Sequence, residues 1–87
     1  MPRSPTISDL VEEGTISDAE VRVAVMAFMA GMPGDEFVIA RGYVLDLTAA
    51  VRGHLGAMQA IADPEVNEDL RRVAVRTAIL RARPEKR

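Results

Sequence analysis

Cysteine is absent from this 87-residue chain, and so is tryptophan. Without cysteine the protein can form neither disulfides nor thiolate metal sites, and its redox compartment cannot be inferred. Aromatic residues make up only 3% of the chain, whereas hydrophobic residues make up 48%. The core must therefore consist of aliphatic, alanine and methionine side chains, a composition that suits helix bundles.

The sequence also lacks a long hydrophobic run. The longest stretch without a charged residue spans residues 23–34, which is shorter than the roughly 20 apolar residues that cross a bilayer. The first residues contain no hydrophobic segment typical of a secretory signal. These absences predict a single-domain cytoplasmic protein with no membrane contact.

Residues that carry chemistry are scarce. His54 is the only histidine, so no second histidine or cysteine can complete a metal site with it. The acidic pairs each lie near an expected helix end, where capping and the helix dipole account for them. The segment Gly31–Gly34 lacks the lysine of a phosphate-binding loop. We therefore expect no catalytic residue, no metal and no cofactor, and a protein that is not an enzyme.

The stretch from Asp35 to Ala62 predicts one long helix with two apolar faces. Large side chains recur at alternating spacings of three and four residues, while small residues occupy the opposite face. A helix that is apolar on two sides is expected to lie buried in the middle of a fold. The seam of large residues consists of Phe37, Ala40, Val44, Leu47, Val51, His54, Met58 and Ile61.

Two alternatives to the long helix stay open. Gly42 allows a break, after which Asp46 or Thr48 could begin a second helix. A β-hairpin with strands at 37–40 and 43–45 also fits the residue types, but residues 47–62 offer such a strand no partner.

Capping signals delimit the other expected helices. Thr6 or Ser8 caps a short helix that runs through Glu13 and ends at Gly14. Ser17 and Glu20 have the spacing of a capping box at the start of a helix over 18–30, which is apolar on every side after its first turn. The Asp63-Pro64 pair predicts the start of the last helix, which ends at about 81–83.

These signals predict an all-α fold, a small helical bundle of three main helices (18–30, 36–62 and 65–82) plus the short N-terminal helix. Residues 1–5 are expected to form a flexible arm, 6–83 a single helical domain and 84–87 a tail. One core is expected to join side chains from all three main helices: Val25 and Phe28, then Phe37, Val44, Leu47 and Val51 of the seam, and Leu70, Val73 and Leu80 of the last helix.

The expected helices carry more apolar surface than a lone bundle can bury, which predicts a two-fold homodimer or a heterologous protein partner. The chain is therefore expected to be a non-enzymatic protein-protein interaction module, a small regulatory or adaptor protein that acts by helix packing. The candidate interaction surface comprises Val51, His54, Met58, Val75 and Ile79.

The arginines of the last helix support an alternative function. Arg72, Arg76 and Arg83 lie on one side of that helix, where they could contact the phosphates of a nucleic acid or an acidic partner. Local pairing of Arg72 with Glu68 and Asp69 competes with this role. A helix-turn-helix is disfavoured, because the helix after Gly34 would begin with acidic and apolar residues rather than with side chains that recognise bases.

Overall fold

The structure is a computed structural model, and it describes residues 5–31, 37–40 and 42–86. The fold is α/β, so the all-α prediction is wrong: the described residues form five helices and a three-stranded antiparallel sheet of order β1-β2-β3. The elements are α1 (Ile7–Glu12), α2 (Asp18–Met29), β1 (Phe37–Ala40), β2 (Tyr43–Leu45), α3 (Leu47–Arg52), α4 (Leu55–Ala62), α5 (Glu68–Arg81) and β3 (Glu85–Lys86).

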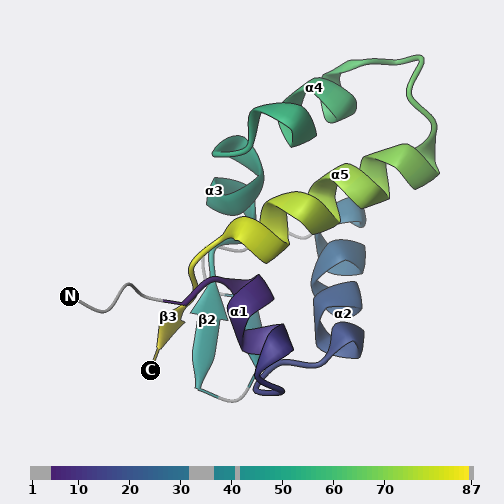
Figure 1. The fold of residues 1–87 in the computed structure, drawn as a ribbon. Coiled ribbons are helices and arrows are strands. Elements are labelled where there is room, and N and C mark those ends of the chain that lie inside the picture. Colours follow the sequence, from purple (N-terminus) through teal and green to yellow (C-terminus); the bar gives the residue numbers. More distant parts are fainter. Residues whose placement is uncertain (1–4, 32–36, 41, 87) are drawn as a thin grey trace.

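Helix α5, not the 35–62 stretch, is the element that the others surround. It crosses the middle of the molecule, with α3 and α4 on one side and α1, α2 and the sheet on the other (Figure 1). It contacts each of the other four helices. The long two-faced helix does not exist, because its residues divide into two strands and two short helices.

A β-hairpin occupies the first half of the expected long helix. β1 pairs antiparallel with β2, with Phe37 opposite Leu45, and Gly42 adopts a φ of 85° that favours glycine. β2 in turn pairs with β3, where Val44 lies opposite Glu85. The prediction of a long helix failed because the partner strand of this hairpin has only two residues and comes from the far end of the chain, where no sequence pattern indicates a strand.

Two polar side chains start the helices in the second half of that stretch. Asp46 caps α3 by accepting a hydrogen bond from the backbone N–H of Ala49 at 2.9 Å. His54 caps α4 in the same way, because its Nδ1 accepts from the N–H of Ala57 at 3.0 Å. The break that the sequence left open is therefore present, and Asp46 begins the new helix as that alternative predicts.

The N-terminal helices follow their capping signals. Thr6 and Asp9 form a complete capping box at the start of α1, and Gly14 follows the helix with a φ of 83°. Ser17 and Glu20 form the capping box of α2, as predicted, with hydrogen bonds of 2.9 and 3.1 Å. These signals succeed because both partners lie within four residues of each other.

The start of α5 differs from the prediction. Asn67 is the N-cap, since its side chain accepts from the N–H of Leu70 at 2.9 Å. Asp63 instead accepts from the N–H of Glu65, also at 2.9 Å, within the turn that leaves α4. The prediction that the last helix starts at Asp63 and Pro64 is therefore wrong, because the Asp63 side chain stabilises a turn rather than the first turn of a helix.

The core gathers around the inward side of α5, which is the opposite of the side expected. Val75 and Ile79 are fully buried, whereas Leu70 and Val73 are 56% and 61% exposed. Leu70 and Val73 are thus wrong as core residues, while Val25 is buried and Phe28 and Leu80 are partly buried as expected. The largest fully buried side chains are those of Ile7, Leu10, Ile16, Leu47, Ile79, Val21, Val51 and Val75.

The C-terminal residues extend the fold beyond the helices. Pro84 is buried, and Glu85 and Lys86 form β3. The backbone N–H of Ile7 at the start of α1 donates to the carbonyl of Ala82 at 2.8 Å. The two ends of the described chain are therefore joined through the end of α5.

Candidate protein-binding surface

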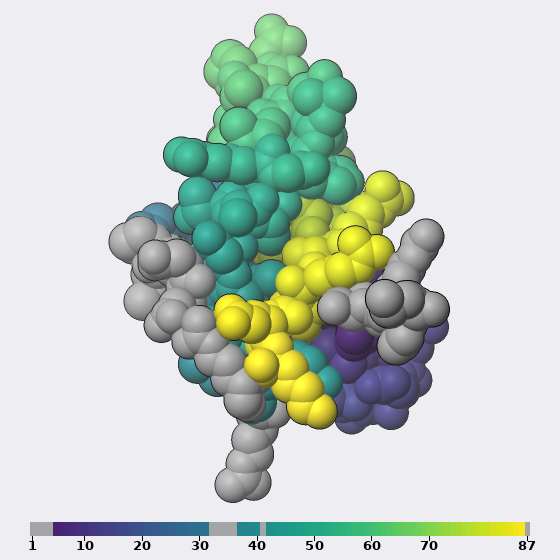
Figure 2. Space-filling view, turned by 90° about the vertical axis from the view of Figure 1, so that its left-hand side faces the viewer, coloured from purple at the N-terminus to yellow at the C-terminus, as the bar shows by residue number. Residues whose placement is uncertain are grey.

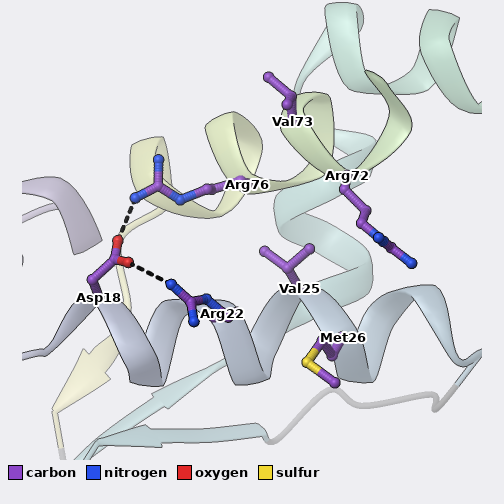
Figure 3. Close-up of a pocket in the computed structure, with 7 residues that line it drawn as sticks. All are labelled: Asp18, Arg22, Val25, Met26, Arg72, Val73 and Arg76. Atoms are coloured by element: carbon purple, nitrogen blue, oxygen red, sulfur yellow. Dashed lines mark hydrogen bonds and ion pairs between the residues drawn. The ribbon is translucent and has the colours of Figure 1, made fainter. Parts of the chain in front are cut away.

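A groove of about 540 Å³ lies between α2 and α5. Figure 3 shows the two helices side by side, with Val25 of α2 directed toward α5 and Arg72 of α5 directed toward α2. The lining residues are Asp18, Arg22, Val25, Met26, Arg72, Val73 and Arg76. The groove therefore combines an apolar middle with three guanidinium groups and one carboxylate.

Helical spacing explains why these side chains meet. Asp18, Arg22 and Val25 follow one another at intervals of four and three residues, so they lie on one side of α2. On α5, Arg72 and Arg76 are four residues apart and flank Val73. Helix α5 thus places an apolar side chain between two arginines, whereas on α2 the apolar side chains follow the charged ones.

The apolar part of the groove is open to solvent. Val25 is buried and forms its floor, whereas Met26 and Val73 are each 61% exposed. Exposed apolar side chains are individually common on proteins, but a concave apolar patch with a polar margin is typical of a binding site. The groove is therefore the first candidate surface for a partner.

Ion pairs close one end of the groove. The Asp18 carboxylate accepts from Arg22 on its own helix at 3.5 Å and from Arg76 on α5 (Figure 3). Arg72 pairs outside the groove, with Glu68 at 3.4 Å and Asp69 at 3.6 Å. All these partners are solvent-exposed, and exposed pairs contribute only about 0–1 kcal/mol each. They can therefore be exchanged at little cost for the carboxylates of a ligand.

Helix α4 presents a second apolar surface. Its sequence, LGAMQAIA, contains no charged residue. Leu55, Met58 and Ile61 follow one another at three-residue spacing and are 72%, 40% and 37% exposed. This part of the chain projects from the rest of the molecule at the top of Figure 2. An uncharged, projecting apolar stripe resembles the buried centre of a homodimer interface in composition.

A shallower hollow of about 330 Å³ brings Asp46 and His54 together with Arg81 and Arg83. Both Asp46 and His54 are occupied as helix caps, so each already accepts a backbone hydrogen bond. Among the described residues no three histidine or acidic side chains are placed to hold a metal ion. This hollow therefore offers no arrangement from which we derive a reaction.

The candidate interaction residues divide into buried and accessible ones. Val51 is 1% exposed, and Val75 and Ile79 are completely buried in the core. These three have no surface left for a partner in this fold. Met58 is exposed on α4, and the half-buried His54 lies at the start of the same helix.

The arginine candidates also lie apart. Arg72 and Arg76 flank the groove, but both are paired with carboxylates. Arg83 lies in the other hollow. The pKa of Asp9 is lowered chiefly by the hydrogen bond from the backbone N–H of Thr6, next by the one with the Thr6 side chain, and least by the charge of Arg83. The three arginines therefore do not form one unpaired cationic ridge.

Sequence reasoning missed an arginine that joins two helices. Arg71 donates from its guanidinium to the carbonyl of Asp63 at 2.8 Å and to that of Ala60 at 3.4 Å. It thereby supplies a donor to the Ala60 carbonyl in the last turn of α4 and a second donor to the Asp63 carbonyl, which also accepts from the N–H of Val66 at 3.3 Å. Sequence reasoning also missed Leu55, Met26 and Val73 as surface residues, because their exposure depends on which side of each helix packs against the other helices.

In comparisons with known proteins, no protein-family model, curated protein or solved structure matches the chain. Within the described residues no helix has the length and apolar character needed to span a membrane.

Proposed function

We propose that this protein is a non-enzymatic protein-binding module, a small cytoplasmic regulator or adaptor that acts by helix packing as a homodimer. The observation that carries the proposal is the distribution of exposed apolar side chains over three helices. Val23 and Met26 lie on α2, Leu55, Met58 and Ile61 on α4, and Leu70 and Val73 on α5. Surface of this kind gains free energy when another protein covers it.

The α4 stripe of Leu55, Met58 and Ile61 is the surface that we assign to the homodimer. Two copies related by a two-fold axis bring identical surfaces together, so an uncharged surface pairs with itself without repulsion. Charged residues would instead have to find partners of opposite sign across the axis. The absence of charge from α4 therefore favours self-association there over the arginine-bearing groove.

The nucleic-acid alternative has less support. Arg72 and Arg76 are paired with Glu68, Asp69 and Asp18, so carboxylates accompany these cations on the same surface. A phosphate backbone offers no apolar group to Met26 and Val73, and Arg83 lies in the other hollow, so the cations do not continue beyond the groove as a row that phosphates could follow. Titration of the protein into a labelled DNA duplex at low and high salt tests this alternative, and tight binding that weakens steeply with salt would revive it.

Light scattering at increasing micromolar concentrations tests the homodimer. We expect a mass near twice the 9.4 kDa of the chain, and Leu55→Asp should reduce it to that of the monomer without loss of the helical circular dichroism signal. Val23→Asp is the matched control, because Val23 is 57% exposed on a different helix. A wild-type mass that stays at 9.4 kDa would reject the dimer. If Val23→Asp dissociated the dimer and Leu55→Asp did not, the interface would lie on α2 and not on α4.

A further inference from the structure

The groove between α2 and α5 differs from the α4 stripe in its charge. Its lining contains three arginines, Arg22, Arg72 and Arg76, but a single carboxylate, Asp18. Apolar side chains separate the two ends: Arg22 and Arg76 meet at Asp18, while Arg72 lies farther along α5 (Figure 3). A ligand that fills this groove must therefore provide both apolar contact and negative charge.

We propose that this groove binds an acidic amphipathic segment of another protein, with an apolar side chain between Met26 and Val73 and carboxylates on Arg22 and Arg72. This inference rests on the proposed function of the chain as a protein-binding module, and it names the chemistry of the partner. A second copy of the chain is a poorer occupant, because two grooves pressed together would place arginine opposite arginine.

The guanidinium groups are able to accept such a ligand. Each arginine has five N–H donors, and Arg22 uses one nitrogen for Asp18 at 3.5 Å. Arg72 holds Glu68 and Asp69 at 3.4 and 3.6 Å, distances longer than those of well-formed charge-assisted hydrogen bonds. Donors therefore remain for carboxylates, which can bind an arginine through two parallel hydrogen bonds.

Arg76 has a different part in this arrangement. It joins α5 to α2 through Asp18, and that carboxylate is also held by Arg22. The cross-helix pair links the two walls of the groove at one end. We therefore assign ligand contact to Arg22 and Arg72, and wall positioning to Arg76.

Fluorescence anisotropy with designed peptides tests the proposal. The probe is a labelled amphipathic helix of roughly 15 residues, long enough to form helix on binding, with leucines on one side and glutamates beside them. Versions with glutamine or lysine in place of glutamate have the same apolar side. We expect the acidic peptide to bind about tenfold more tightly than the glutamine peptide, and the lysine peptide not to bind.

Matched variants locate the binding site. Arg22→Gln with Arg72→Gln should weaken the acidic peptide about tenfold, whereas Arg52→Gln with Arg81→Gln removes the same charge outside the groove and should leave its affinity unchanged. Arg52 and Arg81 are both exposed. Val73→Ser, at an exposed position, should weaken the acidic and glutamine peptides alike.

Several outcomes would overturn the inference. Equal affinity for the acidic and glutamine peptides would show that the groove does not select charge, and the absence of binding by either would reject it as a docking site. Equal losses in the two double-arginine variants would mean that binding follows net charge rather than the groove. The light-scattering result is independent of all three, so failure of this inference is distinguishable from failure of the homodimer.

Discussion

At the scale of the residue, short polar side chains decide where this chain becomes helical. Thr6, Ser17, Asp46, His54 and Asn67 each accept a backbone N–H three residues ahead. Such bonds satisfy donors that the first turn of a helix leaves unpaired. The only histidine of the chain is among them, so its role in this structure is that of a cap.

Replacing His54 tests this role. His54→Ala removes the acceptor for the N–H of Ala57, and we expect it to lower the free energy of unfolding by about 0.5–2 kcal/mol. His54→Asn should restore most of the loss, because asparagine is among the strongest N-cap residues. Urea denaturation at one fixed protein concentration measures both. Equal losses in the two variants would show that His54 contributes by packing rather than by capping.

Asp9 makes the stability of α1 depend on pH. Its pKa lies below its ordinary value, chiefly because the backbone N–H of Thr6 donates to its carboxylate. A carboxyl whose pKa is lower in the folded state stabilises the fold above its ordinary pKa, and this contribution disappears as the pH falls through the lowered value. We therefore expect stability to fall in the range below about pH 4.

The variant Asp9→Asn isolates that contribution, because an amide oxygen still accepts from Thr6 but does not titrate in this range. Its urea midpoint should fall less than that of the wild type between neutral pH and about pH 3. Identical acid dependence in the two proteins would show that other groups cause the change.

At the scale of the element, the sequence predicted best what depends on neighbouring residues. The starts of α1 and α2 follow capping boxes whose members lie three residues apart, and the alternative start at Asp46 was also visible. For the hairpin of Phe37–Ala40 and Tyr43–Leu45 the sequence predicts a helix instead, because the neighbouring residues 47–62 offer a strand no partner. Its third strand is supplied by Glu85–Lys86.

The inward side of α5 could not be predicted, for a different reason. One side of this helix carries leucine and valine and the other carries valine and isoleucine, so its periodicity alone does not identify the core side. Packing against four other helices selects the side of Val75 and Ile79. The groove depends on the same choice, since Arg72 and Val73 lie on the side that this packing leaves outside.

Two aspartate substitutions on α5 distinguish these sides. Ile79→Asp buries an unpaired carboxylate at a fully buried position, which should cost more than about 4 kcal/mol and abolish most of the stability of so small a domain. Val73→Asp changes a side chain that is 61% exposed and should keep the helical signal. Circular dichroism during urea titration measures both variants. If Ile79→Asp remained folded and light scattering showed only a change from the mass of a dimer to that of a monomer, this packing would be contradicted.

At the scale of the whole molecule, the last residues close the fold. The end of α5 binds the start of α1 through the N–H of Ile7 and the carbonyl of Ala82. Pro84 is then buried, and β3 completes the sheet beside β2 in the region where β3, β2 and α1 gather (Figure 1). The sequence predicts a tail at residues 84–87, because Pro84 stops the last helix. The burial of Pro84 and the strand pairing of Glu85 and Lys86 come from contacts distant in sequence.

Deleting residues 84–87 should therefore destabilise the protein although it removes no helix. The deletion removes the two residue pairs between β2 and β3, exposes the edge of β2 and uncovers the surface that Pro84 covers. Since each net hydrogen bond contributes about 0.5–1.5 kcal/mol, the loss should be about 1–3 kcal/mol in urea denaturation. Lys86→Ala is the control, because it keeps the backbone of β3 and changes only an exposed side chain, with an expected effect below about 0.5 kcal/mol. A truncated chain as stable as the wild type would show that the sheet is complete without β3, and that α5 alone holds the two ends of the fold together.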